Sequence, residues 1–100
     1  MATSVIKFDF SNTKVTKPEN TTALVGVDLN NYKLTGIYKG YNATNSPSSL
    51  SGIFVLIVCI YSADWLVQFY VDIGTGDAFT RTFKSGTTWL AWQKVTQTAT

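Results

Sequence analysis

The sequence predicts a small, mainly β domain built on an antiparallel meander, and three observations carry this prediction. Residues 53–61 (IFVLIVCIY) form an apolar run rich in β-branched side chains, typical of a central strand covered on both faces. Residues 65–73 (WLVQFYVDI) alternate with the two-residue period of a strand. Residues 74–77 (GTGD) and 85–88 (SGTT) have the composition of tight turns, which join antiparallel neighbours. A small α+β domain is the alternative.

The other segments fit the same meander. Asp28 is expected to cap a helical turn over residues 28–32, in which Leu29 and Tyr32 share the inward side. The further expected strands are residues 36–41 (GIYKGY), 78–84 (AFTRTFK) and 89–95 (WLAWQKV).

The chain divides into three parts by composition. We expect the domain itself over residues 24–95, and a frayed tail over residues 96–100. Residues 1–23 are expected to form an N-terminal arm, in which residues 4–10 alternate as an amphipathic strand would.

Length and composition exclude several classes of function. The chain has 100 residues, 45% of them hydrophobic, and a formal net charge of +2, which suits one domain with a real core. It has no histidine and a single cysteine, which excludes Ser-His-Asp or Cys-His catalysis, a disulfide framework and a thiolate zinc site. Its basic residues are scattered rather than clustered, and its longest apolar run is too short to span a membrane. We therefore predict a soluble, non-enzymatic domain with no metal, cofactor, nucleic acid or membrane insertion.

The residues that most often carry chemistry are expected to have structural roles here. Asp64 and Asp77 lie in predicted turns, and no two carboxylates share an obvious site, so a glycan-cleaving enzyme acting through Asp72 is the least favoured alternative. Cys59 lies in the middle of the apolar run and is predicted to be a core residue. Arg81, the sole arginine, is predicted to pair with an internal carboxylate such as Asp72. Stacking on an aromatic ring or holding an acidic glycan group are its alternatives.

Aromatic side chains, 14% of the chain, are the most informative group. Flat aromatic faces bind the C–H faces of sugar rings beside neutral amides and hydroxyls, but small β domains also fill their cores with such residues. Trp89 and Trp92, three positions apart, would point to opposite faces of a regular strand, which places one in the core and exposes the other. The candidate ligand-binding residues are Tyr41, Asn42 and Asn45 of the polar loop, together with Trp89 and Trp92.

Several segments, taken in order, carry a family resemblance: DLNNY at 28–32, TGIY at 35–38, WLVQFY at 65–70, RTFK at 81–84 and WLAWQKV at 89–95. Together they resemble the pyocin-knob family, small domains in the tail fibres and baseplate proteins of bacteriophages and phage-tail-like bacteriocins. The resemblance covers about residues 24–95, and the close R-T-F followed by W-x-x-W-x-K-V is its most specific part. Thr35 stands where the family usually has proline, and Leu90 where it commonly has serine. Leu90 adds an apolar group that hints at a contact surface.

The resemblance implies a non-enzymatic knob domain of a virion tail fibre or baseplate, acting outside the host cell. It also implies a homo-oligomer, with a trimer favoured, contacts with other tail and baseplate proteins, and attachment to a bacterial surface saccharide. The alternative is a purely structural assembly module, whose exposed aromatic residues contact other subunits and no receptor.

Overall fold

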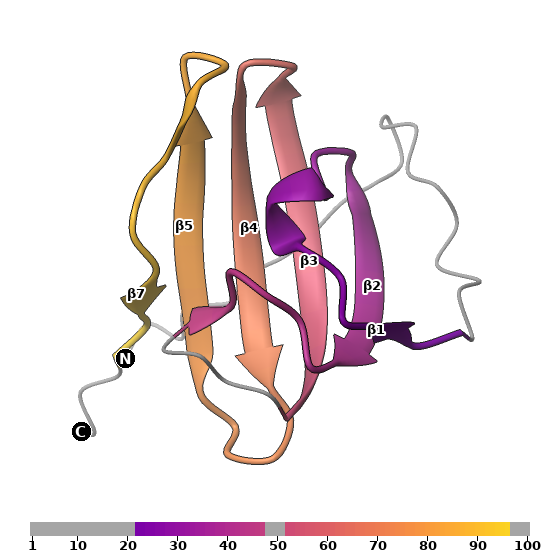
Figure 1. Ribbon diagram of the computed structural model, residues 1–100. Coiled ribbons are helices and arrows are strands. Elements are labelled where there is room, and N and C mark those ends of the chain that lie inside the picture. The colour runs from indigo at the N-terminus through magenta and orange to yellow at the C-terminus, as the bar shows by residue number, and fades with distance from the viewer. Residues whose placement is uncertain (1–21, 48–51, 97–100) are drawn as a thin grey trace, which may run out of the picture.

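The computed structural model describes residues 22–47 and 52–96, which form one seven-stranded sheet (Figure 1). The strands are β1 (Leu24–Val25), β2 (Gly36–Tyr41), β3 (Ile53–Ser62), β4 (Trp65–Asp72), β5 (Ala78–Lys84), β6 (Thr88–Trp89) and β7 (Gln93–Lys94). From β2 to β5 each strand pairs antiparallel with the next along the chain, which confirms the predicted meander. The strand predicted at residues 4–10, and nearly all of the predicted arm and tail, lie outside the described residues.

The first strand departs from the antiparallel pattern, since β1 pairs parallel with the end of β2. Leu24 lies opposite Gly40, and any side chain at position 40 would overlap the Leu24 carbonyl oxygen. Gly40 therefore allows the close backbone approach that closes this edge of the sheet.

The predicted helical turn is present as the 3-10 helix η1 (Leu29–Asn31). Its cap is Asp28, whose carboxylate accepts a hydrogen bond from the Asn30 backbone N–H at 2.9 Å. Leu29 is fully buried, and Tyr32 packs partly buried against the core. The inward pair predicted from the sequence is thus confirmed.

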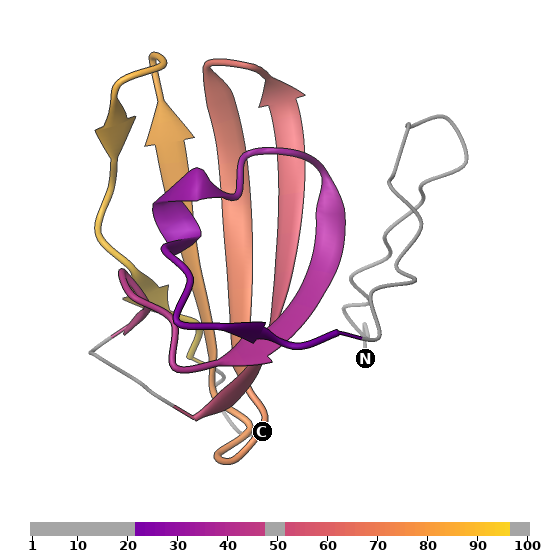
Figure 2. The same cartoon turned by 45° about the vertical axis from the view of Figure 1, so that its right-hand side comes forward.

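One face of the sheet, here called the inner face, carries the core. η1 and residues 42–47, here called the loop after β2, lie across this face, which is turned toward the viewer in Figure 1 and seen obliquely in Figure 2. Stacking between Phe54 and Tyr70, with ring centroids 5.0 Å apart, lies at its centre. The inner-face residues of the three long strands are Phe54, Leu56 and Val58 on β3, Leu66, Gln68, Tyr70 and Asp72 on β4, and Phe79, Arg81 and Phe83 on β5.

The opposite face, here called the outer face, is apolar, and its central side chains are partly buried. Its central rows are Val55–Val71–Ala78, Ile57–Phe69–Thr80 and Cys59–Val67–Thr82. All nine side chains are partly buried. The sequence predicted that β3 is covered on both faces, whereas the described residues cover its inner face alone. The more apolar side of β4 consequently faces outward, and the side that carries Gln68 and Asp72 faces the core.

The predicted strand at residues 89–95 is interrupted. β6 pairs with the end of β5 at Phe83 and Lys84, and β7 pairs with its start at Phe79 and Thr80. The residues between them leave the ladder, so the strict alternation of a strand does not hold there. Trp89 and Trp92 therefore both turn to the inner face, which corrects the prediction that they point to opposite faces.

Candidate functional site

Two regions of the molecule have the composition of a site: a polar cluster that joins the inner face to the loop after β2, and a hollow on the outer face. Arg81 is the centre of the first. Its guanidinium carbon lies 3.8 Å from the ring centroid of Trp89 and 4.5 Å from that of Trp92. Its Nε donates a hydrogen bond of 2.9 Å to Oε1 of Gln68, the residue opposite it on β4.

This arrangement corrects the predicted pairing of Arg81 with a carboxylate such as Asp72. The Asp72 carboxylate instead accepts a hydrogen bond from the Thr75 backbone N–H at 3.1 Å, within the turn after β4. The stacked arrangement, the alternative in the sequence analysis, is the one observed. Burial disfavours the charged guanidinium and lowers the pKa of Arg81 to about 10, and the negative charge of Asp28 partly offsets this effect.

Gln68 links the cluster to the chain that covers it. Its Nε2 donates to the backbone oxygens of Leu29 at 2.8 Å and Tyr32 at 2.9 Å, so one buried amide holds both ends of the helical turn. No role of Gln68 was predicted from the sequence. The available signal was an amide that shares the side of a strand with Leu66 and Tyr70, because a polar group in such a place has to be paired.

Several hydrogen bonds hold the loop after β2 in place. Asn45 Nδ2 donates to the Asp28 carboxylate at 2.7 Å, and the Asn45 backbone oxygen accepts from the Trp92 indole N–H at 2.8 Å. The Thr44 backbone N–H donates to the Val27 oxygen at 2.8 Å. The Asn45 amide and the Asn30 backbone N–H both favour the ionised carboxylate and hold the pKa of Asp28 below its ordinary value.

The structure brings some of the predicted site residues together and not others. Asn45 and Trp92 are hydrogen-bonded, and Trp89 joins them through Arg81. Tyr41 and Asn42 are exposed neighbours at the end of β2, and no contact described here joins them to the two tryptophans. Asn42 and Asn45 have positive φ angles of 57° and 56°, a conformation that asparagine tolerates better than most residues.

The contacts of Trp89 and Trp92 are therefore mainly structural. Both are partly buried, both face the Arg81 guanidinium, and Trp92 uses its indole N–H within the domain. What the cluster presents to solvent is the loop itself, where Asn42, Thr44 and Asn45 are exposed. The result is a surface of neutral amides and hydroxyls, which the exposed Tyr41 precedes along the chain.

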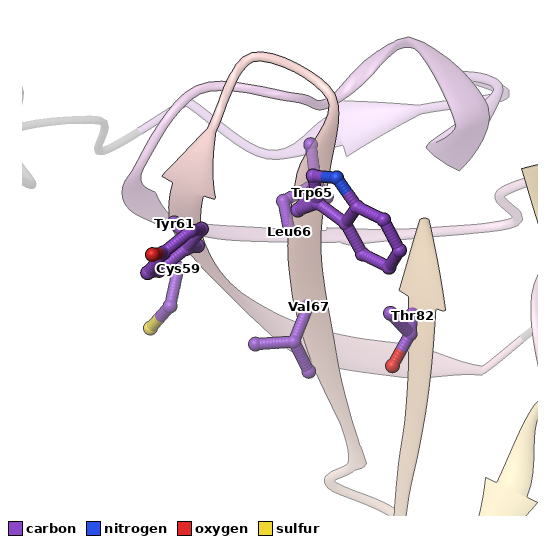
Figure 3. A pocket seen from close by; sticks show the side chains of 6 residues that line it. All are labelled: Cys59, Tyr61, Trp65, Leu66, Val67 and Thr82. Atoms are coloured by element: carbon purple, nitrogen blue, oxygen red, sulfur yellow. The ribbon is translucent and has the colours of Figure 1, made fainter. Parts of the chain in front are cut away.

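The second region is a hollow of about 370 Å³ at the Trp65 end of the outer face (Figure 3). The Trp65 indole lies beside Thr82 on one side of Val67, and Cys59 and Tyr61 lie on the other side. Tyr61 is 91% exposed. It is the extra residue of a bulge, since Ile60 pairs with Leu66 and Ser62 pairs with Trp65, and a bulge redirects a side chain out of the sheet.

Cys59 lines this hollow and is not a core residue, which corrects the prediction from the sequence. Its side chain alternates onto the outer face, where it is half-buried opposite Val67. The apolar surroundings raise the pKa of the thiol, because partial burial disfavours the thiolate. Cys59 does lie in the middle of the apolar run, but the run alone cannot show which of the two sides of the strand is fully buried.

Other chemistry is limited in the part of the chain that the structure describes. Residues 22–47 and 52–96 contain no group of three or more histidine, cysteine, aspartate or glutamate side chains arranged to hold a metal ion. Within the same ranges, no helix has the length and apolar character that crossing a membrane requires.

Among known proteins, a structural neighbour was found, but no sequence family. No family model and no curated protein matches this sequence, so the resemblance to the pyocin-knob family stays a prediction. A solved structure of the Pseudomonas aeruginosa R1 pyocin fibre, comprising its C-terminal residues 323–701, is similar in fold with a TM-score of 0.64 and 24% sequence identity. The match covers 73% of this chain and 20% of that fragment, so this chain corresponds to about a fifth of the fibre fragment it matches.

Proposed function

We propose that this chain is a domain of a phage-type tail fibre that attaches the particle to saccharides on a bacterial surface. The observation that carries the proposal is the fold shared with part of the R1 pyocin fibre. The protein would then work in the virion tail, outside the host cell, by binding without cleavage. We extend the proposal to contacts with other tail and baseplate proteins, because a domain of this size is one part of a fibre.

The fastened loop after β2 is the proposed attachment surface. Tyr41, 45% exposed, offers an aromatic face, and Asn42, Thr44 and Asn45 offer neutral hydrogen-bonding groups. Because the loop is already held by Asp28 and Trp92, binding a sugar requires little further ordering of the chain. One shallow site of this kind binds weakly, so several copies on one fibre would supply avidity.

Binding of the protein to purified polysaccharides from Gram-negative and Gram-positive envelopes tests this proposal. The double variant Tyr41→Ala, Asn42→Gly removes the ring and the amide, while the glycine keeps the positive φ at position 42. We expect a loss of binding of about tenfold or more, the effect of removing a contact of roughly 1.4 kcal/mol or stronger. Tyr61→Ala is the matched control, because it removes an exposed tyrosine of the outer face.

Three results would contradict the proposal. They are a wild-type protein that binds no envelope polysaccharide, a double variant that binds as well as the wild type, and release of reducing sugar that Asp72→Asn abolishes. The last result would mean that the domain is a glycan-cleaving enzyme.

A structural role in fibre assembly, without receptor binding, is the second candidate function. The observation that favours it is the outer face, whose three central strands present an apolar surface that the described residues leave partly exposed. Surfaces of this kind mark protein contacts.

A further inference from the structure

We infer that the attachment surface recognises an anionic saccharide, one that bears carboxylate or phosphate groups, through Lys39 and Tyr41 of β2. This inference rests on the proposed function and names the class of saccharide that the domain would bind. Both residues lie on the strand that leads into the loop after β2, beside the short edge strand β1 (Figure 2).

Lys39 and Tyr41 point to the same side of β2. The register between β2 and β3 is regular over all six residues of β2, so side chains two positions apart share a side. Two residues of a strand span about 6.6 Å, at a rise of about 3.3 Å per residue. Both side chains are exposed, whereas Gly40 between them is buried and pairs with Leu24 of β1. The ammonium group and the aromatic ring therefore project from neighbouring positions of a strand that is paired on both sides.

Tyr41 is the middle of a short apolar row at this end of the sheet. Its register partners are Val25 of β1 and Ile53 of β3. The side chains of Val25, Tyr41 and Ile53 are 50%, 45% and 54% exposed. An aromatic ring flanked by aliphatic groups offers an apolar surface to the C–H face of a sugar ring. The row lies on β1, β2 and the start of β3, at the opposite end of the sheet from the hollow beside Trp65.

Lys39 supplies an unpaired positive charge beside this row. Within residues 22–47 and 52–96, Lys94 pairs with Asp77 at 3.6 Å and Lys33 lies over an aromatic ring, but Lys39 contacts no carboxylate and no ring. The Asp28 carboxylate, on the chain that follows β1, already accepts two hydrogen bonds within the domain. A carboxylate or phosphate oxygen that accepts from Lys39 would form a charge-assisted hydrogen bond, which is stronger than a neutral one. The charge at this edge thus favours an acidic sugar over a neutral one.

Arg81 cannot provide this contact, although the sequence also allowed it to hold an acidic glycan group. The residue is only 6% exposed, and its guanidinium faces the rings of Trp89 and Trp92. An anion outside the domain can therefore reach Lys39 but not Arg81.

Removing the acidic groups of the ligand tests the inference. The purified envelope polysaccharides are each used in three forms: untreated, with carboxyl groups reduced to alcohols, and with phosphate esters removed by hydrogen fluoride. We expect one treatment to weaken binding by about tenfold or more, the loss of one contact to a charged group, and the effective treatment identifies the anion. Charges are screened over about 30 Å at 0.01 M salt and about 3 Å at 1 M. Affinity for the untreated form should therefore fall as salt rises, and affinity for the neutralised form should not.

Substitutions of two exposed lysines locate the contact. Lys39→Gln should weaken binding of the untreated polysaccharide by about tenfold and leave binding of the neutralised form unchanged. Lys84→Gln is the matched control, because it removes the same charge from an exposed lysine of β5, at the other end of the sheet from Tyr41. It should change neither affinity. Lys39→Arg keeps the charge and should retain binding, and far-UV circular dichroism verifies that each variant is folded.

The outcomes separate this inference from the proposed function. A loss of affinity that is confined to Lys39→Gln, and that disappears when the polysaccharide is neutralised, supports the inference. Binding that survives both chemical treatments, an equal loss in Lys84→Gln, or a Lys39→Gln protein that binds as the wild type does overturns it and leaves saccharide attachment in place. A wild type that binds none of the polysaccharides overturns both.

Discussion

The two sides of β4 depart from the usual relation between polarity and burial. The inner face of β4 carries Gln68 and Asp72, and both are buried. The outer face of the same strand carries Val67 and Phe69, and both remain partly exposed in the described residues. Of the residues that the structure describes, η1, the loop after β2 and the two tryptophans all lie on the inner side.

The comparison teaches how polar side chains can be part of an apolar core. Each amide hydrogen-bonding direction of Gln68 has a partner, in Leu29, Tyr32 and Arg81, so the cost of burying this amide is offset. The outer face contains no buried amide or charged group in its central rows, so it makes no such demands. In this domain the paired polar side chains of the inner face help to hold the fold together.

Substituting one residue on each face of β4 should give the largest difference in the free energy of unfolding. Gln68→Leu leaves two backbone oxygens and the buried Arg81 without their partner, and we expect it to lower the free energy of unfolding by about 3–5 kcal/mol. Val67→Thr, the next residue along the chain, has a similar shape and should cost less than about 1 kcal/mol. Urea unfolding at low micromolar protein concentration measures both. Equal losses of unfolding free energy in the two variants would contradict the proposed difference between the two faces.

Two tryptophans, one on each face, test the same comparison with a smaller expected effect on stability. Trp92→Phe removes the hydrogen bond to the Asn45 oxygen and part of the stack on Arg81, which we expect to cost about 1–2 kcal/mol. For a domain of this size that loss lowers the melting temperature by about 5–15 °C. Trp65→Phe, at a position 45% exposed on the outer face, should lower it by less than about 3 °C. A thermal melt in which Trp65→Phe is the more damaging change would reverse this assignment.

The sequence predicted the meander because its signals are local. The alternation of β4, the composition of the turns and the Asp28 cap all act within a few residues, and each is present in the structure. The burial of Cys59 and the opposite orientations of Trp89 and Trp92 were predicted wrongly for a common reason. They depend on which segments, distant along the chain, come to lie over which side of the sheet, and no local pattern records that.

The candidate site divides in the same way. The exposure of Asn42 and Asn45 follows from a polar loop, and the sequence indicated both residues. The hollow beside Trp65 depends on a one-residue bulge at Tyr61, and Arg81 depends on Gln68 across a strand pair. Such features come from register, which one sequence does not specify.

The smallest expected effect concerns the fastening of the loop and its response to pH. The pKa of Asp28 in the folded protein lies below its ordinary value of 3.8, because the Asn45 amide and the Asn30 N–H favour the carboxylate. A carboxyl of this kind binds a proton more readily in the unfolded chain, so its contribution to stability is present above pH 3.8 and is lost as the pH falls through the lower, folded pKa. Asp28→Asn keeps an oxygen that can accept from Asn30 but removes the charge and the titration. The difference in unfolding free energy between the two proteins should therefore be largest near neutral pH and shrink below pH 3.8. A difference that stays constant with pH would show that the charge of Asp28 does not fasten the loop, whereas the outer face, which has no acidic side chain in its central rows, gives no such dependence in either case.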